Sequence, residues 1–288
     1  MGFSNEPIRL VEVGPRDGLQ NEADFVPTEL KVAFVDALSG TGLGEIEVSS
    51  FVSPKWVPQL ADAAEVFRRI RRAPGVRYSA LVPNEPGLDR AVEARVDAVA
   101  VFTAASESFS RRNINATIAE SLERFRPVIA RSPVPVRGYV STAFHCPFEG
   151  PVSPAAVLAV ARSLLELGCQ EVSIGDTIGK ASADEVRRLL EVLLAAIPAG
   201  RLAMHFHDTF GQAVENARAS VELGVSCLDG SAGGIGGCPY APGAPGNVAT
   251  ESLVRAFPGR TGVDLERLAA AAGIVRGALG RTRQAQQT

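Results

Sequence analysis

The stretch Pro154-Ala-Ala-Val-Leu-Ala-Val-Ala-Arg-Ser-Leu-Leu-Glu-Leu-Gly168-Cys-Gln-Glu-Val-Ser-Ile-Gly175 predicts a helix followed by a strand. Pro154 suits a first helical turn, and Gly168 ends the helical pattern that runs from Ala155 to Leu167. The short apolar segment from Gln170 to Gly175 is typical of a buried strand. Such an alternation of helix and strand is the repeating unit of parallel α/β folds.

The same alternation recurs along the chain, for example in a helix predicted over Thr28 to Leu38. We expect eight strands, at Ile8 to Val13, Glu45 to Ser49, Val76 to Val82, Asp97 to Thr103, Val134 to Thr142, Gln170 to Gly175, Arg201 to His207 and Val225 to Gly230. Eight strands, each followed by a helix, close a (β/α)8 TIM barrel, although an open doubly wound sheet has a similar periodicity. We favour the barrel, at about residues 7–260. A C-terminal helical extension follows, with a helix at Leu265 to Leu279 that would cap the barrel or contact a partner subunit.

The composition excludes several classes of protein. The chain has 288 residues, 46% of them apolar, which is enough for one large core, and we treat residues 1–288 as one domain. Basic residues are scattered and the net charge is -3, which disfavours nucleic-acid binding. The sequence has no apolar run long enough to span a membrane and no secretory signal, so we expect a soluble, cytoplasmic protein. The four cysteines form no Cys-x-x-Cys pair, as suits a reducing compartment.

Unusual polar residues fall at the carboxyl ends of the predicted strands, where barrel enzymes carry their catalytic groups. They are Arg16 and Asp17 after the first strand, Glu47 in the second, Asp176 after the sixth, and His205 and His207 in the seventh. The paired histidines are the most telling signal, because alternate residues of a strand point to the same face. Two imidazoles so placed can chelate one cation, although half-buried histidines also serve as ordinary hydrogen-bonding groups. The neighbouring Asp208, and Asp17 across the barrel mouth, favour the metal.

A carboxylate, two imidazoles and an amide oxygen from the loop after the eighth strand would suit a divalent cation. Asn247 is the candidate for that amide, although without other context a plain turn asparagine would be the favoured interpretation. Ligand type does not choose the ion; we favour Mg²⁺ or Mn²⁺, with Zn²⁺ and Co²⁺ as alternatives. The lysines Lys31, Lys55 and Lys180 all lie outside the predicted strands, which disfavours Schiff-base chemistry and favours activation by a metal.

The glycine-rich and proline-rich segment from Gly233 to Gly246 predicts a loop over the active face. It matches neither a Walker A motif nor a dinucleotide fingerprint, so we interpret it as a lid that carries one reactive side chain, Cys238. The alternative for Cys238 is a small buried apolar residue. Arg16 could neutralise a developing oxyanion or form a structural ion pair, and Asp176 and Glu47 could equally be buried structural carboxylates.

With these residues placed, the sequence resembles the 3-hydroxy-3-methylglutaryl-CoA lyase family, a branch of the metal-dependent TIM-barrel lyases that also include isopropylmalate and homocitrate synthases. The resemblance extends from Val11 to about Glu251. Its motifs are Val11-Glu-Val-Gly-Pro-Arg-Asp-Gly-Leu-Gln-Asn-Glu22, Ser49-Ser-Phe-Val-Ser-Pro-Lys-Trp-Val-Pro58, Ile174-Gly-Asp-Thr-Ile-Gly179, His205-Phe-His-Asp-Thr-Phe-Gly-Gln212 and Gly236-Gly-Cys-Pro-Tyr240. The last of these resembles the cysteine loop of the lyases, which the synthases lack.

The resemblance implies roles for individual residues. It implies metal ligands at Asp17, His205, His207 and Asn247. It implies a catalytic set of Arg16, Cys238, Asp176, Glu47 and His205. As substrate-binding residues we predict Arg16, Ser50, Tyr139, Ser173 and Glu251.

The implied activity is a metal-assisted retro-Claisen cleavage of 3-hydroxy-3-methylglutaryl-CoA to acetyl-CoA and acetoacetate. His205, Asp176 and Asp17 are all candidates for the base. Two departures from the family's usual sequence, in the loop 231–237 and at Phe144-His145, could touch the acyl pocket. We therefore keep three alternatives: a lyase for longer or differently branched 3-hydroxyacyl-CoA, a condensing synthase that joins an acyl-CoA to a 2-keto acid, and a barrel that only binds acyl-CoA. The resemblance also implies a homodimer and a place in leucine degradation or ketone-body metabolism.

Overall fold

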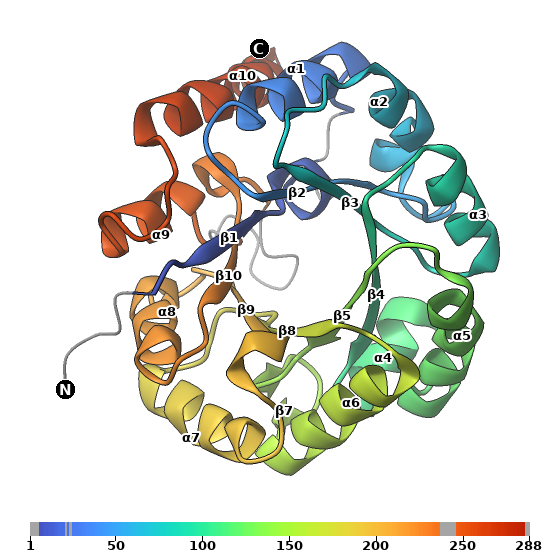
Figure 1. Ribbon diagram of the computed structural model, residues 1–288, viewed down its shortest axis with the longest axis vertical. Coiled ribbons are helices and arrows are strands. Elements are labelled where there is room, and N and C mark those ends of the chain that lie inside the picture. The colour runs from blue at the N-terminus through green and yellow to red at the C-terminus, as the bar shows by residue number, and fades with distance from the viewer. Residues whose placement is uncertain (1–5, 21, 23–24, 237–245, 286–288) are drawn as a thin grey trace.

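Eight parallel strands form a closed barrel within the part of the chain that the computed structural model describes, residues 6–20, 22, 25–236 and 246–285 (Figure 1). Around the barrel the order is β1-β10-β9-β8-β5-β4-β3-β2. Because β1 pairs with both β10 and β2, the sheet has no free edge, which confirms the TIM barrel and rules out the open sheet. The barrel strands are β1 (Arg9–Glu12), β2 (Glu45–Ser50), β3 (Arg77–Leu81), β4 (Ala98–Ala104), β5 (Val136–Ser141), β8 (Glu171–Asp176), β9 (Leu202–Phe206) and β10 (Cys227–Gly230).

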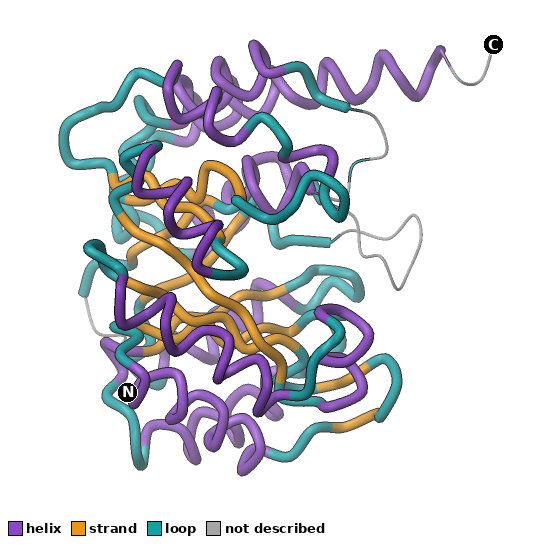
Figure 2. Tube along the Cα trace, turned by 90° about the vertical axis from the view of Figure 1, so that its right-hand side faces the viewer, coloured by secondary structure: helices purple, strands orange, loops and turns teal. Residues whose placement is uncertain are grey.

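The helices form a ring outside the strands, and from the side the strands run obliquely across the middle of the molecule (Figures 1 and 2). They are α1 (Thr28–Leu38), α2 (Ala63–Arg69), α3 (Glu85–Glu93), α4 (Glu107–Ile114), α5 (Ile118–Arg131), α6 (Pro154–Leu167), α7 (Ala183–Leu194), α8 (Ala213–Glu222), α9 (Thr250–Ala256) and α10 (Leu265–Ala285). No helix in the described ranges has both the length and the apolar character needed to cross a membrane.

The unit formed by α6 and β8 shows how the sequence builds the barrel. The Ser153 hydroxyl accepts a hydrogen bond from the Ala156 amide at the start of α6, and Gly168 ends the helix at φ 116°, a conformation that glycine adopts without steric penalty. In β8, Val172 and Ile174 pack into the apolar layer under the helices. Ser173, between them, faces the barrel interior.

The apolar core therefore lies mainly between the strands and the helices, and the barrel interior is more polar. Two small apolar clusters lie inside, one of Val11, Val13, Ala203 and Cys227 and the other of Leu81, Ala100 and Tyr139. Charged side chains occupy much of the remaining interior and pair with one another, as in the contact of Arg137 with Asp229. Buried charges are tolerated where such partners satisfy them.

The predicted strands were all found, with ends that differ by a few residues, and the predicted helix Thr28–Leu38 was correct at both ends. A two-stranded hairpin after β5, formed by β6 (His145–Cys146) and β7 (Gly150–Pro151), was not anticipated. The C-terminal helix continues to Ala285 and packs against α1 on the side of the barrel.

Candidate active site

A tight turn after β1 positions Arg16 and Asp17. Residues Gly14–Gly18 form one turn of π-helix, in which the amides of Asp17 and Gly18 both donate to the Val13 carbonyl, at 2.7 and 3.2 Å. Glycine is needed at both ends of the turn: a Cβ on Gly14 would lie 2.5 Å from the Glu12 carboxylate, and one on Gly18 would lie 2.7 Å from Ile235. The turn thus directs two charged side chains toward the barrel mouth.

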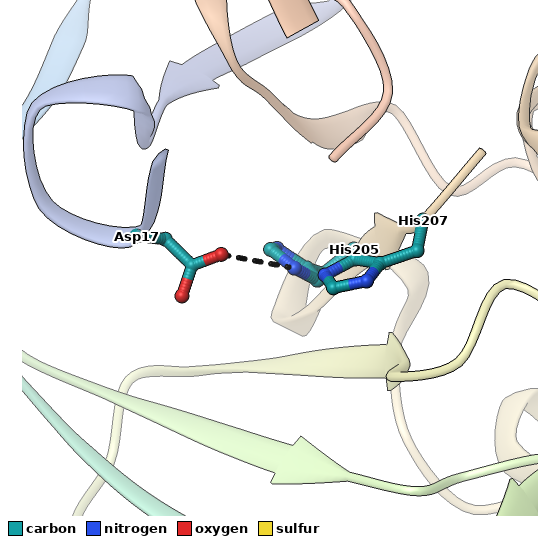
Figure 3. A group of neighbouring side chains, drawn as sticks. All are labelled: Asp17, His205 and His207. Carbon is teal, nitrogen blue, oxygen red and sulfur yellow. Dashed lines mark ion pairs between the residues drawn. The ribbon is translucent and has the colours of Figure 1, made fainter. Parts of the chain in front are cut away.

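His205 in β9 and His207 just beyond it lie on the same side of the strand, as the alternation of strand side chains predicts. Figure 3 shows both imidazoles facing Asp17, which approaches from the turn after β1. One candidate ligand atom from each of the three side chains lies within 4.8 Å of the others. His205 Nε2 is 4.0 Å from Asp17 Oδ2. This is a group that could hold a metal ion.

Asn247 lies beside this group because residues 246–248 run along the end of β9. The Asp208 amide donates to the Gly246 carbonyl, and the Val248 amide donates to the Phe206 carbonyl. The Asn247 side chain donates from Nδ2 to Asp17 Oδ2 at 2.9 Å. The amide predicted from the loop after the eighth strand is therefore in contact with the predicted carboxylate ligand.

Two buried polar side-chain atoms at this group are available to bind a cation. His207 Nδ1 and Asn247 Oδ1 are both buried and have no hydrogen-bond partner among the described residues. Such orphaned atoms cost about 1–3 kcal/mol each, which an ion would offset. Burial lowers the pKa of His207 to about 4, so its imidazole is neutral at pH 7. Burial alone would raise the pKa of Asp17, but Arg16 and the two histidines hold it below its ordinary value. Both groups are therefore in the unprotonated form that metal binding requires.

Arg16 is buried between two carboxylates. Its Nε donates to Glu47 Oε2 at 2.7 Å and its Nη1 to Asp17 Oδ1 at 2.5 Å, while the guanidinium lies 5.4 Å from the Tyr139 ring centre. Burial alone would lower the pKa of Arg16, but Glu47 and Asp17 raise it above the usual value. Glu47 lies where the pairing of β2 with β3 shifts register between Glu47 and Ser49. The result is a permanent positive charge beside the candidate metal group.

Asp229 in β10 belongs to the same network, although sequence reasoning missed it. Its carboxylate is fully buried and accepts hydrogen bonds from Arg137 Nη2 at 2.6 Å and Ser173 Oγ at 2.9 Å. It also lies 3.3 Å from His205 Nδ1. Burial opposes ionisation, but Arg137 and His205 lower the pKa of Asp229 to about 2. The available signal was an aspartate inside a predicted strand, next to the strand with the paired histidines.

Three of the remaining predicted residues have other local partners. Asp176 ends β8, and its carboxylate accepts hydrogen bonds from the Lys180 and Ala181 amides, while burial raises its pKa to about 6. The Ser50 hydroxyl accepts from the Val52 amide. Glu251 accepts from the Gly233 amide with both oxygens, at 2.9 Å. Cys238 lies outside the described residues.

Glu12 is a second buried carboxylate that sequence reasoning did not single out. Its Oε1 accepts from the Gly14 and Ala232 amides, both at 2.8 Å, and its Oε2 accepts from the Thr250 hydroxyl at 2.7 Å. It therefore joins the turn that carries Arg16 to the segment after β10 and to the start of α9. Burial raises its pKa to about 7 despite these hydrogen bonds.

This pKa predicts how Glu12 affects stability. Because the folded-state pKa exceeds the ordinary 4.5, the contribution of Glu12 is complete below pH 4.5 and is lost as pH rises through 7. The loss is about 3 kcal/mol. Glu12→Gln cannot ionise, and it can keep its oxygen toward the two amides and donate to Thr250. Relative to wild type, it should gain about 2.5 kcal/mol of unfolding free energy between pH 5 and pH 8, measured by urea unfolding with chelator present. Parallel pH profiles for the two proteins would contradict the assignment.

Together, the closed barrel and the side chains at the carboxyl ends of β1, β9 and β10 define an α/β-barrel protein with a candidate metal site at its mouth. The chain belongs to the HMGL-like family, whose model matches residues 7–275.

Relatives and a solved structure agree with this membership. A Danio rerio protein named 3-hydroxy-3-methylglutaryl-CoA lyase, cytoplasmic, is 51% identical over 95% of this chain and 84% of its own length. A Pseudomonas aeruginosa protein named 3-hydroxy-3-isohexenylglutaryl-CoA/hydroxy-methylglutaryl-CoA lyase is 52% identical over 96% of this chain and 94% of its own. An HMG-CoA lyase from Acinetobacter baumannii, solved with coenzyme A and 3-methylmalate, has a TM-score of 0.91 at 36% identity and covers 97% of this chain and 93% of its own.

Proposed function

We propose that this chain is a carbon–carbon lyase that cleaves 3-hydroxy-3-methylglutaryl-CoA into acetyl-CoA and acetoacetate. The observation that carries the proposal is the meeting of Arg16 and Asp17 with His205 and His207 at the barrel mouth. The names of relatives about half identical to this chain over nearly its whole length support the same activity.

Asp17, His205, His207 and Asn247 are the residues that would hold a divalent cation. When bound, such a cation would supply Lewis-acid polarisation of substrate oxygens. The mixed set of oxygen and nitrogen ligands suits a divalent cation without choosing among ions, and Mg²⁺ or Mn²⁺ is the proposed ion. Zn²⁺ and Co²⁺ are the alternatives that metal analysis would detect.

The reaction begins when a base removes the proton of the C3 hydroxyl. The C2–C3 bond then breaks, its electron pair passes to the thioester as an enolate, and C3 becomes the ketone carbon of acetoacetate. Arg16, held in place by Glu47 and stacked near Tyr139, places its charge where the enolate oxygen develops. A proton delivered to C2 completes acetyl-CoA, and Cys238 stays the predicted donor.

The three candidate bases differ in their surroundings. Asp17 is the weakest, because Arg16 and the histidines hold its pKa low. Asp176, with a pKa of about 6, is ionised at neutral pH and ends the strand that pairs with β9. Asp176 is therefore the base we favour, because His205 keeps no free ring nitrogen when Nε2 binds the cation and Nδ1 donates to Asp229. The predicted contributors to substrate binding also include Ser50, Ser173 and Glu251. Each of these side chains already makes a hydrogen bond within the protein.

The acyl preference depends on the segment after β5. Phe144 is buried, its ring centre lies 6.4 Å from that of Phe206, and His145 Nε2 is 2.9 Å from Glu185 Oε1. The name of the Pseudomonas relative includes a longer isohexenyl substrate, so both branch types belong in the assay.

The proposal is tested by incubating the purified chain with divalent cation and a panel of 3-hydroxy-3-alkylglutaryl-CoA thioesters. We expect acetyl-CoA and acetoacetate from the methyl compound, at the highest kcat/KM of the panel. Release of free CoA from acetyl-CoA and a 2-keto acid, with no cleavage, would identify a synthase instead. Binding of acyl-CoA without turnover in either direction would identify a binding protein.

The setting of the enzyme completes the proposal. Acyl-CoA is the proposed substrate, as coenzyme A binding by the Acinetobacter lyase supports. We infer a homodimer, a cytoplasmic location and a place in leucine degradation or ketone-body metabolism. The Danio relative with a cytoplasmic name supports the location.

A further inference from the structure

Asp229 is placed to control one of the two candidate histidine ligands. It lies on β10, whose residues Leu228 and Asp229 pair with Met204 and His205 of β9. This pairing brings Asp229 Oδ2 to 3.3 Å from His205 Nδ1, while His205 Nε2 faces Asp17. The two ring nitrogens of His205 therefore face different carboxylates, one at the barrel mouth and one deeper in the barrel.

A carboxylate can only accept a hydrogen bond, so the ring nitrogen beside Asp229 must carry a hydrogen. When His205 is neutral it has a single ring hydrogen, and placing it on Nδ1 leaves the Nε2 lone pair directed toward Asp17. His207 differs, because its Nδ1 is buried with no partner among the described residues. The fold thus fixes the tautomer and ring orientation of His205 through a dedicated acceptor.

Asp229 is itself held by two donors. Arg137 Nη2 donates to Oδ1 at 2.6 Å, and the Ser173 hydroxyl donates to Oδ2 at 2.9 Å, the oxygen that also faces His205. Arg137 is fixed in turn, with Nε 3.2 Å from Glu171 Oε1 and its guanidinium 5.1 Å from the Tyr139 ring centre. Any rotation of the Asp229 carboxylate would break at least one of its contacts with Arg137, Ser173 and His205.

We infer that Asp229 is a positioning residue that prepares His205 Nε2 to bind the cation, with Arg137 and Ser173 setting the orientation of Asp229. The inference rests on the metal site of the proposed function. Histidine ligands of metals commonly depend on such an acceptor, and its loss typically weakens metal binding by about 10–100-fold.

Asp229→Asn gives a sharp test, because Arg137 has no acceptor and can pair only with the amide oxygen. The amide nitrogen must then occupy the position of Oδ2 and donate to His205 Nδ1, which forces the ring hydrogen onto Nε2. Calorimetric titration of Mn²⁺ into the chelator-treated full chain should show that the variant's Kd for Mn²⁺ is raised by about 10–100-fold relative to wild type. Nitrogen-15 spectra at pH 9 should show the His205 hydrogen on Nδ1 in wild type and on Nε2 in the variant. The chain has three histidines, so a His205→Gln variant assigns the signal.

Two controls separate this role from packing. Ser173→Ala removes a hydrogen bond but keeps the carboxylate, so Nδ1 should stay protonated and Kd should rise by less than in Asp229→Asn. Asp97→Asn makes the same carboxylate-to-amide change at a half-exposed pair with Arg72 and should leave Kd unchanged.

An unchanged Mn²⁺ Kd in folded Asp229→Asn overturns the inference, as does wild-type His205 with its hydrogen on Nε2. The variant Asp17→Asn shows which claim has failed. If it binds Mn²⁺ more weakly than wild type while Asp229→Asn binds normally, the metal site stands and only the positioning role of Asp229 fails. If Asp17→Asn also binds Mn²⁺ normally, the metal site itself fails and the inference with it.

Discussion

An Arg16→Gln variant should retain its metal but lose on the order of 10³-fold or more in kcat. The Arg16 guanidinium is buried, and Glu47 and Asp17 fix its direction. A charge preorganised in this way stabilises an enolate oxygen without reorganising during the reaction. Glutamine keeps a hydrogen-bond donor but removes the positive charge. Since the enolate charge is absent from the bound substrate and develops in the transition state, we expect the loss in kcat rather than in KM. Steady-state kinetics with 3-hydroxy-3-methylglutaryl-CoA and metal analysis of the same sample test both parts.

Two further variants define what the Arg16 result means. Arg72→Gln removes a guanidinium from a partly exposed pair with Asp97 and should leave kcat unchanged. Arg16→Lys keeps the charge but not the fork that contacts two carboxylates at once, so its kcat should lie between those of wild type and Arg16→Gln. A folded Arg16→Gln enzyme within tenfold of wild-type kcat would remove Arg16 from the chemistry. Loss of metal from that variant would instead assign Arg16 to maintaining the metal site.

The barrel could be predicted because its signals are local. Each strand and helix shows its own periodicity, and helix ends such as Gly168 have specific residue preferences. The π-helical turn at Gly14–Gly18 and the register shift in β2 could not be predicted. Both depend on contacts distant in sequence, with residues such as Ile235 and with β3. These two irregularities are what direct Arg16 and Glu47 toward each other.

The candidate site, like the barrel, was predictable only where its residues follow a local pattern. His205 and His207 lie two residues apart at the end of β9, so the two-residue period placed them together, and barrel closure placed Asp17 opposite. Asp229 lies inside a strand with no motif around it, and Glu12 lies inside a strand just before the polar residues that drew attention in its motif. Their partners, such as His205 for Asp229 and Ala232 for Glu12, become neighbours only when β10 pairs with β9 and β1. Sequence reasoning thus found the groups at strand ends and missed the carboxylates that hold them.

Removal of divalent cations should abolish cleavage, with a loss on the order of 10³-fold or more that added Mg²⁺ or Mn²⁺ reverses. The expected loss is large because polarisation of the substrate oxygens is worth several kcal/mol and each ~1.4 kcal/mol changes the rate tenfold. His207→Ala should lose activity in the same way, because it deletes a neutral imidazole whose buried Nδ1 has no described partner. The measurements are activity before and after chelation and Mn²⁺ stoichiometry by electron paramagnetic resonance.

His145→Gln provides the matched control for metal content. His145 lies in the hairpin after β5 and pairs with Glu185, so it offers no ligand to the group formed by Asp17, His205 and His207. Its variant should therefore bind Mn²⁺ with wild-type stoichiometry, whereas His207→Ala should not. Because burial lowers the pKa of His207 to about 4, protons do not compete at this ligand at pH 7. Full activity in protein shown to be free of metal would refute the proposed mechanism, since Arg16 alone leaves the C3 hydroxyl without polarisation.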